Sequence, residues 1–149
     1  MKTLRYIIEA AVLYLFFGLF RLLTPKAASN LGGFIGRVIG SRLAASRKAY
    51  RNLSAAMPHL KAHEQKDIIT DMWDNLGRVI AEYPHLKTIS KNHTVLTNPE
   101  ILQDFIMQEQ PAVFFGAHQG NWEVNGAMLF TQFEQPVDIT YRAPNNPWS

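Results

Sequence analysis

Cysteine is absent from this chain of 149 residues. Its absence excludes a disulfide scaffold, a thiol nucleophile, an iron–sulfur cluster and any zinc site built on thiolates. Long tracts of proline, glycine, serine or glutamine are also missing, which excludes fibrous and low-complexity proteins. Charged residues make up 18% of the chain and hydrophobic residues 47%, so the chain is not a disordered charged tail. Its length allows one ordinary domain, or a smaller domain joined to a membrane segment.

Acidic residues are scarce in the first third of the chain. Residues 1–51 contain nine Lys and Arg residues but one acid, Glu9, for a net charge of +8. Residues 52–149 carry a net charge of −5, which brings the total to +3. A basic end on a weakly acidic body predicts an anionic partner, either a membrane surface or a nucleic acid.

The same basic end contains the longest apolar run, Leu4–Leu23. Its uncharged core, Ala10–Phe20, is 11 residues long, shorter than the ~20 residues that a spanning helix needs. The flanking residues supply the missing length if Arg5 and Arg21 extend their charges to the headgroups. Because no cleavage site for a signal peptidase follows, we expect a membrane anchor that either spans the bilayer or lies in its interface.

A second apolar stretch, Leu31–Gly40, carries Gly32, Gly36 and Gly40 at four-residue spacing. This spacing places the three glycines on one helical face, where another backbone can approach closely. The nearby cations suit anionic headgroups, although they are alternatively a solvated helix face. No nucleic-acid-binding module accompanies the charge, so we expect a membrane partner and no nucleic acid.

These features predict two parts. Residues 1–51 form a membrane anchor with basic interfacial helices, and residues 52–149 form the beginning of a second domain. Most of the cations follow the apolar core, and the positive-inside tendency then keeps the rest of the chain in the cytoplasm.

The middle of the chain is typical of a helical scaffold. Apolar residues between Ala62 and Tyr83 recur at steps of one and three, which predicts an amphipathic helix that ends at Pro84. We expect Met72 and Trp73 on its apolar stripe to lie in the core. Four histidines show no ligand spacing and are interpreted as surface or turn residues: His59, His63, His85 and His93.

The chemistry is expected after a short apolar run, Ala112–Ala117, which is typical of a buried parallel strand. A second strand is expected at Val137–Tyr141, so the fold class is predicted as α/β. His118 follows the first strand and Glu123 lies in the helix after it, at the strand end where open α/β sheets bind ligands. If the turn brings the two together, Glu123 orients the imidazole of His118, which then accepts a proton from a substrate hydroxyl. The pair is alternatively a chance spacing with a structural role.

The segment from Phe115 to Glu123 resembles the signature of the bacterial lipid A biosynthesis acyltransferases, the lauroyl/myristoyl group of the lysophospholipid acyltransferase superfamily. The N-terminal apolar helix, the basic stretch that follows and the segment from Tyr141 to Pro147 are also similar to that family. The resemblance therefore covers nearly the whole chain and implies the glycerolipid-acyltransferase-like α/β fold. It implies an enzyme of the bacterial inner membrane that moves a fatty acyl group from acyl carrier protein to a hydroxyl of a lipid A precursor.

By this resemblance His118 is the general base and Glu123 its partner. Gly120 and Asn121 within the motif are expected to contact substrate. Arg142 matches a family position near the anionic substrate, although it alternatively caps a strand end. Nothing in the sequence indicates a metal or an organic cofactor.

Three alternatives stay open. The acceptor is another glycolipid or a lysophospholipid, the donor is coenzyme A, or the chain is a non-catalytic membrane-surface protein. Members of the family continue past the position that corresponds to Ser149, so we expect the chain to be the N-terminal part of a longer acyltransferase domain.

Overall fold

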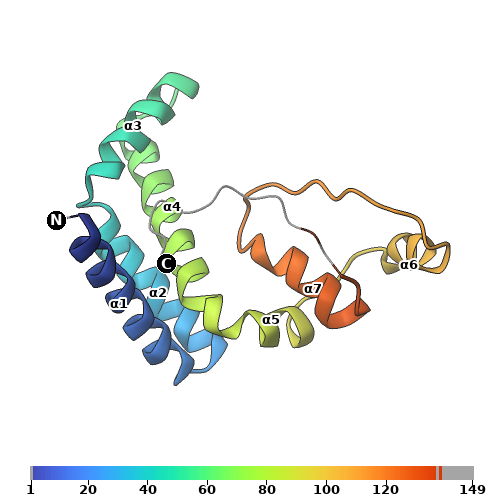
Figure 1. The fold of residues 1–149 in the computed structure, drawn as a ribbon. Coiled ribbons are helices and arrows are strands. Elements are labelled where there is room, and N and C mark those ends of the chain that lie inside the picture. The colour runs from blue at the N-terminus through green and yellow to red at the C-terminus, as the bar shows by residue number, and fades with distance from the viewer. Residues whose placement is uncertain (1, 137, 139–149) are drawn as a thin grey trace. The chain divides into compact units, whose positions relative to one another are not determined.

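The computed structural model describes residues 2–136 and residue 138 of the chain. Contacts divide these residues into two compact units, one that ends at His85 and one that begins at Leu86. Figure 1 labels the α-helices. In chain order the helical elements are α1 (Lys2–Arg21), α2 (Pro25–Gly40), α3 (Ala44–Ala56), α4 (Ala62–Glu82), the 3-10 helix η1 (Tyr83–His85), α5 (Leu86–Asn92), α6 (Pro99–Met107) and α7 (Glu123–Phe133).

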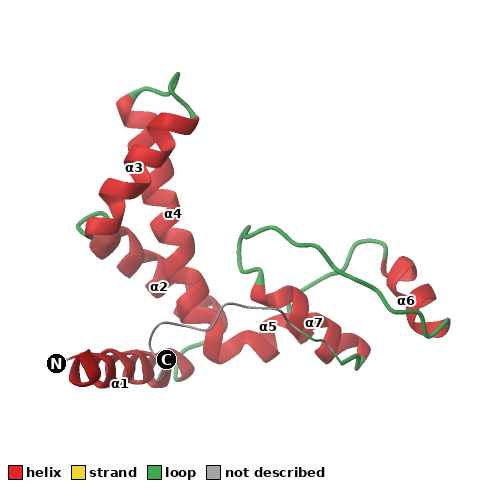
Figure 2. Cartoon of the chain, turned by 45° about the horizontal axis from the view of Figure 1, so that its top comes forward, coloured by secondary structure: helices red, strands yellow, loops and turns green. Residues whose placement is uncertain are grey.

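The predicted strand at Ala112–Ala117 is wrong. Helices and loops make up the part of the chain that the structure describes, with no strand in it (Figure 2). Residues 112–117 form an exposed loop between α6 and α7. A strand needs a neighbour to pair its backbone N–H and C=O groups, and the described residues offer this run no such neighbour. The second predicted strand, Val137–Tyr141, lies outside the described residues except for Asp138, and an α/β architecture stays a prediction.

Helix α1 is long and apolar enough to cross a membrane. Residues Thr3–Arg21 have a mean hydropathy of 1.6, and only 11% of their most apolar window is buried inside the protein. The one acid, Glu9, forms an ion pair with Arg5 one turn earlier, with 3.2 Å between Nε and Oε1. This pairing lowers the cost of a carboxylate in an apolar helix. The predicted apolar helix is therefore present.

Helices α2 and α4 pack through their glycines. A Cβ atom built on Gly32 would overlap the carbonyl oxygen of Gly77, and one built on Gly36 would overlap the carbonyl oxygen of Trp73. The close backbone approach predicted from the glycine spacing is confirmed, and α4 is the helix that approaches.

The indole of Trp73 lies against Gly40, where a Cβ atom would overlap the ring. Its Nε1 donates a hydrogen bond to Ser46 Oγ at 2.8 Å, and Ser46 Oγ donates to the carbonyl of Gly40 at 2.6 Å. Trp73 is half-buried rather than in the core, and it joins α4 to the start of α3. The expectation for Met72 is wrong, because its side chain is exposed.

Asp74 on α4 is shared by two arginines. Its carboxylate pairs with Arg37 of α2 and with Arg78 of its own helix, with 2.5 Å between Oδ2 and the Arg78 Nε. Arg78 also donates to Asn30 Oδ1 at 2.9 Å. Arg37, one of the cations expected to face anionic headgroups, is therefore committed to an ion pair within this unit.

His85 lies in the 3-10 turn η1, one of its two predicted placements, but its side chain is buried rather than at the surface. Its Nε2 lies 2.9 Å from the carbonyl oxygen of Phe20, near the end of α1. The carbonyl of Phe20 also accepts from the amide of Leu23 at 3.0 Å, so the ring N–H from η1 is a second donor to a carbonyl at the end of α1. Spacing alone gave no sign of this contact, because the two residues are 65 positions apart.

Candidate active site

The second unit is built around one small apolar core. Leu102 of α6 packs with Met128 and Leu129 of α7, and Phe133 and Leu96 add to this cluster. This core holds α7 in place, and with it Glu123, the first residue of α7.

Helix α5 is joined to α7 by hydrogen bonds. Thr131 Oγ1 donates to Ser90 Oγ at 3.1 Å, and Gln132 Nε2 donates to the carbonyl of Thr94, two residues after the end of α5, at 3.0 Å. Ser90 is fully buried, and its hydroxyl is satisfied by this contact and by donating to the carbonyl of Lys87 at 3.2 Å. Two elements therefore hold the helix that carries the expected catalytic carboxylate.

The residues from His118 to Trp122 form a tight turn that leads into α7. The amide of Gln119 donates to the carbonyl of Ala117 at 2.8 Å. Gly120 has φ = 56°, a left-handed conformation that residues with a side chain rarely adopt. The turn before the helix, predicted from Gly120, is confirmed.

His118 is exposed and lies against the indole of Trp122. The ring centroids are 4.5 Å apart and the ring planes are tilted by 47°. The aromatic contact limits the rotation of the imidazole, although the rest of the side chain faces solvent. Trp122 was not among the predicted site residues. The sequence feature that could have identified it is an aromatic residue four positions after His118.

Glu123 is the first residue of α7 and is half-buried. It directly follows Trp122 in the sequence. The prediction placed Glu123 in this helix, and the helix begins with it. A carboxylate at this position also interacts favourably with the positive end of the helix dipole.

Two backbone amides at the start of α7 already donate hydrogen bonds. Val124 N donates to the carbonyl of Asn121 at 3.2 Å, and Asn125 N donates to the carbonyl of Trp122 at 3.1 Å. Oxyanion donors are therefore expected earlier in the turn.

The remaining predicted site residues fall in two places. Gly120 and Asn121 belong to the turn, and Asn121 is half-buried. Arg142 lies outside the described residues. Within the described ranges, no group of three or more His, Cys, Asp or Glu side chains is arranged to hold a metal ion.

Comparisons with known proteins bear on the whole chain. Neither a search of curated proteins nor a search of solved structures found a match. The model of one protein family, bacterial lipid A biosynthesis acyltransferase, matches residues 1–148. Because this match covers nearly the full length, the chain belongs to the bacterial lipid A biosynthesis acyltransferase family and is an acyltransferase.

Proposed function

We propose that the protein is a membrane-bound O-acyltransferase that moves a fatty acyl group from acyl carrier protein to a hydroxyl of a lipid A precursor. Membership of the family supports an acyl donor and a lipid acceptor. The observation that carries the proposal is the turn before α7, in which His118 contacts Trp122 and Glu123 follows directly.

In the proposed mechanism, His118 is the general base. One ring nitrogen accepts the proton of the acceptor hydroxyl, and the resulting oxygen nucleophile attacks the thioester carbonyl. The carboxylate of Glu123 orients the imidazole and stabilises its protonated form. When the tetrahedral intermediate collapses, the carbon–sulfur bond breaks and the leaving thiolate takes up the proton from His118. No side-chain nucleophile is needed, which agrees with the absence of cysteine.

The oxyanion of the tetrahedral intermediate needs hydrogen-bond donors. The amides of Val124 and Asn125 already donate within the turn, so we assign this role to the amide of Gly120. Successive amides around a left-handed residue form a concavity that binds anions. Arg142 is proposed to contact the anionic acceptor.

The basic end of the chain sets the proposed location. Residues 1–51 anchor the protein in the bacterial inner membrane, and residues 52–149 lie on its cytoplasmic side. The apolar helix α1 and the nine cations of the first 51 residues support this assignment.

A panel of donors and acceptors tests the proposed substrates. The protein in membranes is given labelled acyl carrier protein thioester or labelled acyl coenzyme A, and either a lipid A precursor or a lysophospholipid. The proposal expects label in the lipid A precursor, with the carrier-protein donor the more effective. Labelling of the lysophospholipid alone contradicts the proposed acceptor, a preference for coenzyme A contradicts the donor, and no transfer in any combination contradicts the activity.

A further inference from the structure

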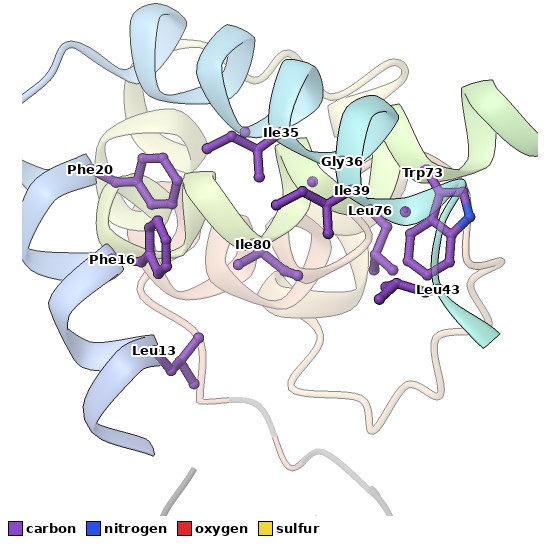
Figure 3. Close-up of a pocket in the computed structure, with 13 residues that line it drawn as sticks. Leu13, Phe16, Phe20, Ile35, Gly36, Ile39, Leu43, Trp73, Leu76 and Ile80 are labelled. Carbon is purple, nitrogen blue, oxygen red and sulfur yellow. The ribbon is translucent and has the colours of Figure 1, made fainter. Parts of the chain in front are cut away.

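An apolar groove runs between α1 and the pair formed by α2 and α4. Figure 3 shows Phe16 and Phe20 of α1 facing Ile35 of α2 and Ile80 of α4. From Phe20 towards Leu13, α1 diverges from the other two helices, so the groove is open along one side. Its volume is about 190 Å³. An apolar lining of this kind accepts apolar groups.

The groove has no polar side chain to satisfy. Its lining consists of aliphatic and aromatic side chains and glycines, and the one polar atom among them, Trp73 Nε1, already donates to Ser46. One wall belongs to α1, the helix proposed above as the membrane anchor, so in the anchored protein the groove opens onto lipid. The environment therefore offers hydrocarbon chains as occupants.

Charge indicates which lipid is held. The groove ends at Leu43, directly after the exposed Arg42, and α3 follows with three more exposed cations, Arg47, Lys48 and Arg51. Residues 10–63 contain neither Asp nor Glu. Cations clustered beside a membrane segment attract anionic headgroups.

We propose that this groove binds one acyl chain of an anionic phospholipid of the surrounding bilayer, with the phosphate held by Arg42 and the cations of α3. The lipid fills the space between α1 and the α2–α4 pair. This site is separate from the acyl transfer proposed above, and it needs no contact with His118.

Fluorescence quenching of Trp73 tests the proposal, because its indole lines the groove. The full chain carries Trp122→Phe and Trp148→Phe, so that Trp73 is the sole reporter, and is placed in phosphatidylcholine vesicles. A minor fraction of phosphatidylglycerol with bromine on its acyl chains is then added. We expect strong quenching that unlabelled phosphatidylglycerol reverses, and much weaker quenching by the same fraction of brominated phosphatidylcholine. Equal quenching by the two lipids, or no quenching, overturns the proposal. This experiment requires no substitution in the groove.

Two variants of α4 distinguish lipid binding in the groove from general contact with lipid. Ile80 lines the groove and Ile68 does not, yet their exposed fractions are nearly equal, 38% and 41%. Ile80→Phe fills the groove and is expected to reduce the quenching, whereas Ile68→Phe is not. The same loss in both variants, or in neither, overturns the proposal. Arg42→Ala leaves the lining intact and is expected to weaken the phosphatidylglycerol effect about fivefold, and an unchanged effect contradicts the assigned headgroup contact.

Discussion

The imidazole of His118 and the indole of Trp122 lie with their ring centroids 4.5 Å apart, immediately before the helix that begins with Glu123. Contacts between aromatic rings contribute about 0.5–1.5 kcal/mol beyond the area that they bury. On an exposed turn, such a contact favours one orientation of the imidazole over the others. We therefore interpret Trp122 as a positioning residue for the proposed base.

Replacement of Trp122 tests this interpretation. Trp122→Ala is expected to lower kcat about two- to tenfold, because the imidazole samples unproductive orientations, and to leave KM for the acyl donor unchanged. Trp122→Phe keeps an aromatic face and is expected to retain most of the rate. Steady-state acyl transfer measures both constants. Equal losses in the two variants, or a change in KM alone, would show that the indole has another role.

The glycine contact between α2 and α4 predicts a loss of stability. Gly36→Ala places a methyl group against the carbonyl of Trp73, and such overpacking costs about 1–3 kcal/mol. Gly18→Ala is the matched control, because nothing lies within 4 Å of a Cβ atom there. Thermal unfolding followed by circular dichroism in detergent is expected to show a lower Tm for Gly36→Ala and an equal or higher Tm for Gly18→Ala. Equal melting of Gly36→Ala and the unchanged protein would contradict this packing.

Asp74 offers a second test in the same unit. Asp74→Asn removes the charge shared by Arg37 and Arg78, and the loss of a hydrogen bond to a charged group costs about 1.5–3 kcal/mol. Partial exposure of both arginines places the expected cost at the low end of this range. Asp71→Asn, an exposed position on the same helix, serves as the control and is expected to change little. Unfolding in urea gives the free energy of unfolding of each variant. Equal values for Asp74→Asn and Asp71→Asn would mean that the ion pairs of Asp74 add nothing to stability.

His85 is expected to hold the end of α1. His85→Ala removes the side-chain donor to the carbonyl of Phe20, which keeps the amide of Leu23 as a partner, and is expected to cost about 0.5–1.5 kcal/mol, whereas His85→Gln keeps an N–H and recovers part of the loss. Hydrogen exchange of the amides near the end of α1 reports the effect directly. Unchanged exchange in His85→Ala would contradict this role.

The helices of the first unit could be predicted from the sequence because their signals are local. Four-residue glycine spacing placed Gly32 and Gly36 on one face, and the step pattern of α4 gave its length closely. The partners were not predictable in the same way. Nothing in the spacing pairs His85 with Phe20 or Arg37 with Asp74, since these contacts join residues 65 and 37 positions apart.

The candidate site shows a similar division. The left-handed Gly120 and a helix after it follow from local rules of turn chemistry. The run Ala112–Ala117 has strand composition, but a strand exists only with a partner, and composition does not supply one. The contact between His118 and Trp122 depends on side-chain orientation within the turn, which the motif alone leaves open.

The most direct test of the proposed function is the rate of acyl transfer to the lipid A precursor in membranes that contain His118→Ala. His93→Ala, at an exposed position, is the matched control. The proposal predicts a loss of at least about 100-fold for His118→Ala, because general-base catalysis contributes about 10²–10⁴-fold, and an unchanged rate for His93→Ala. A folded His118→Ala protein, with the helical circular dichroism of the unchanged chain and its full transfer rate, would contradict the assignment of His118 as the base.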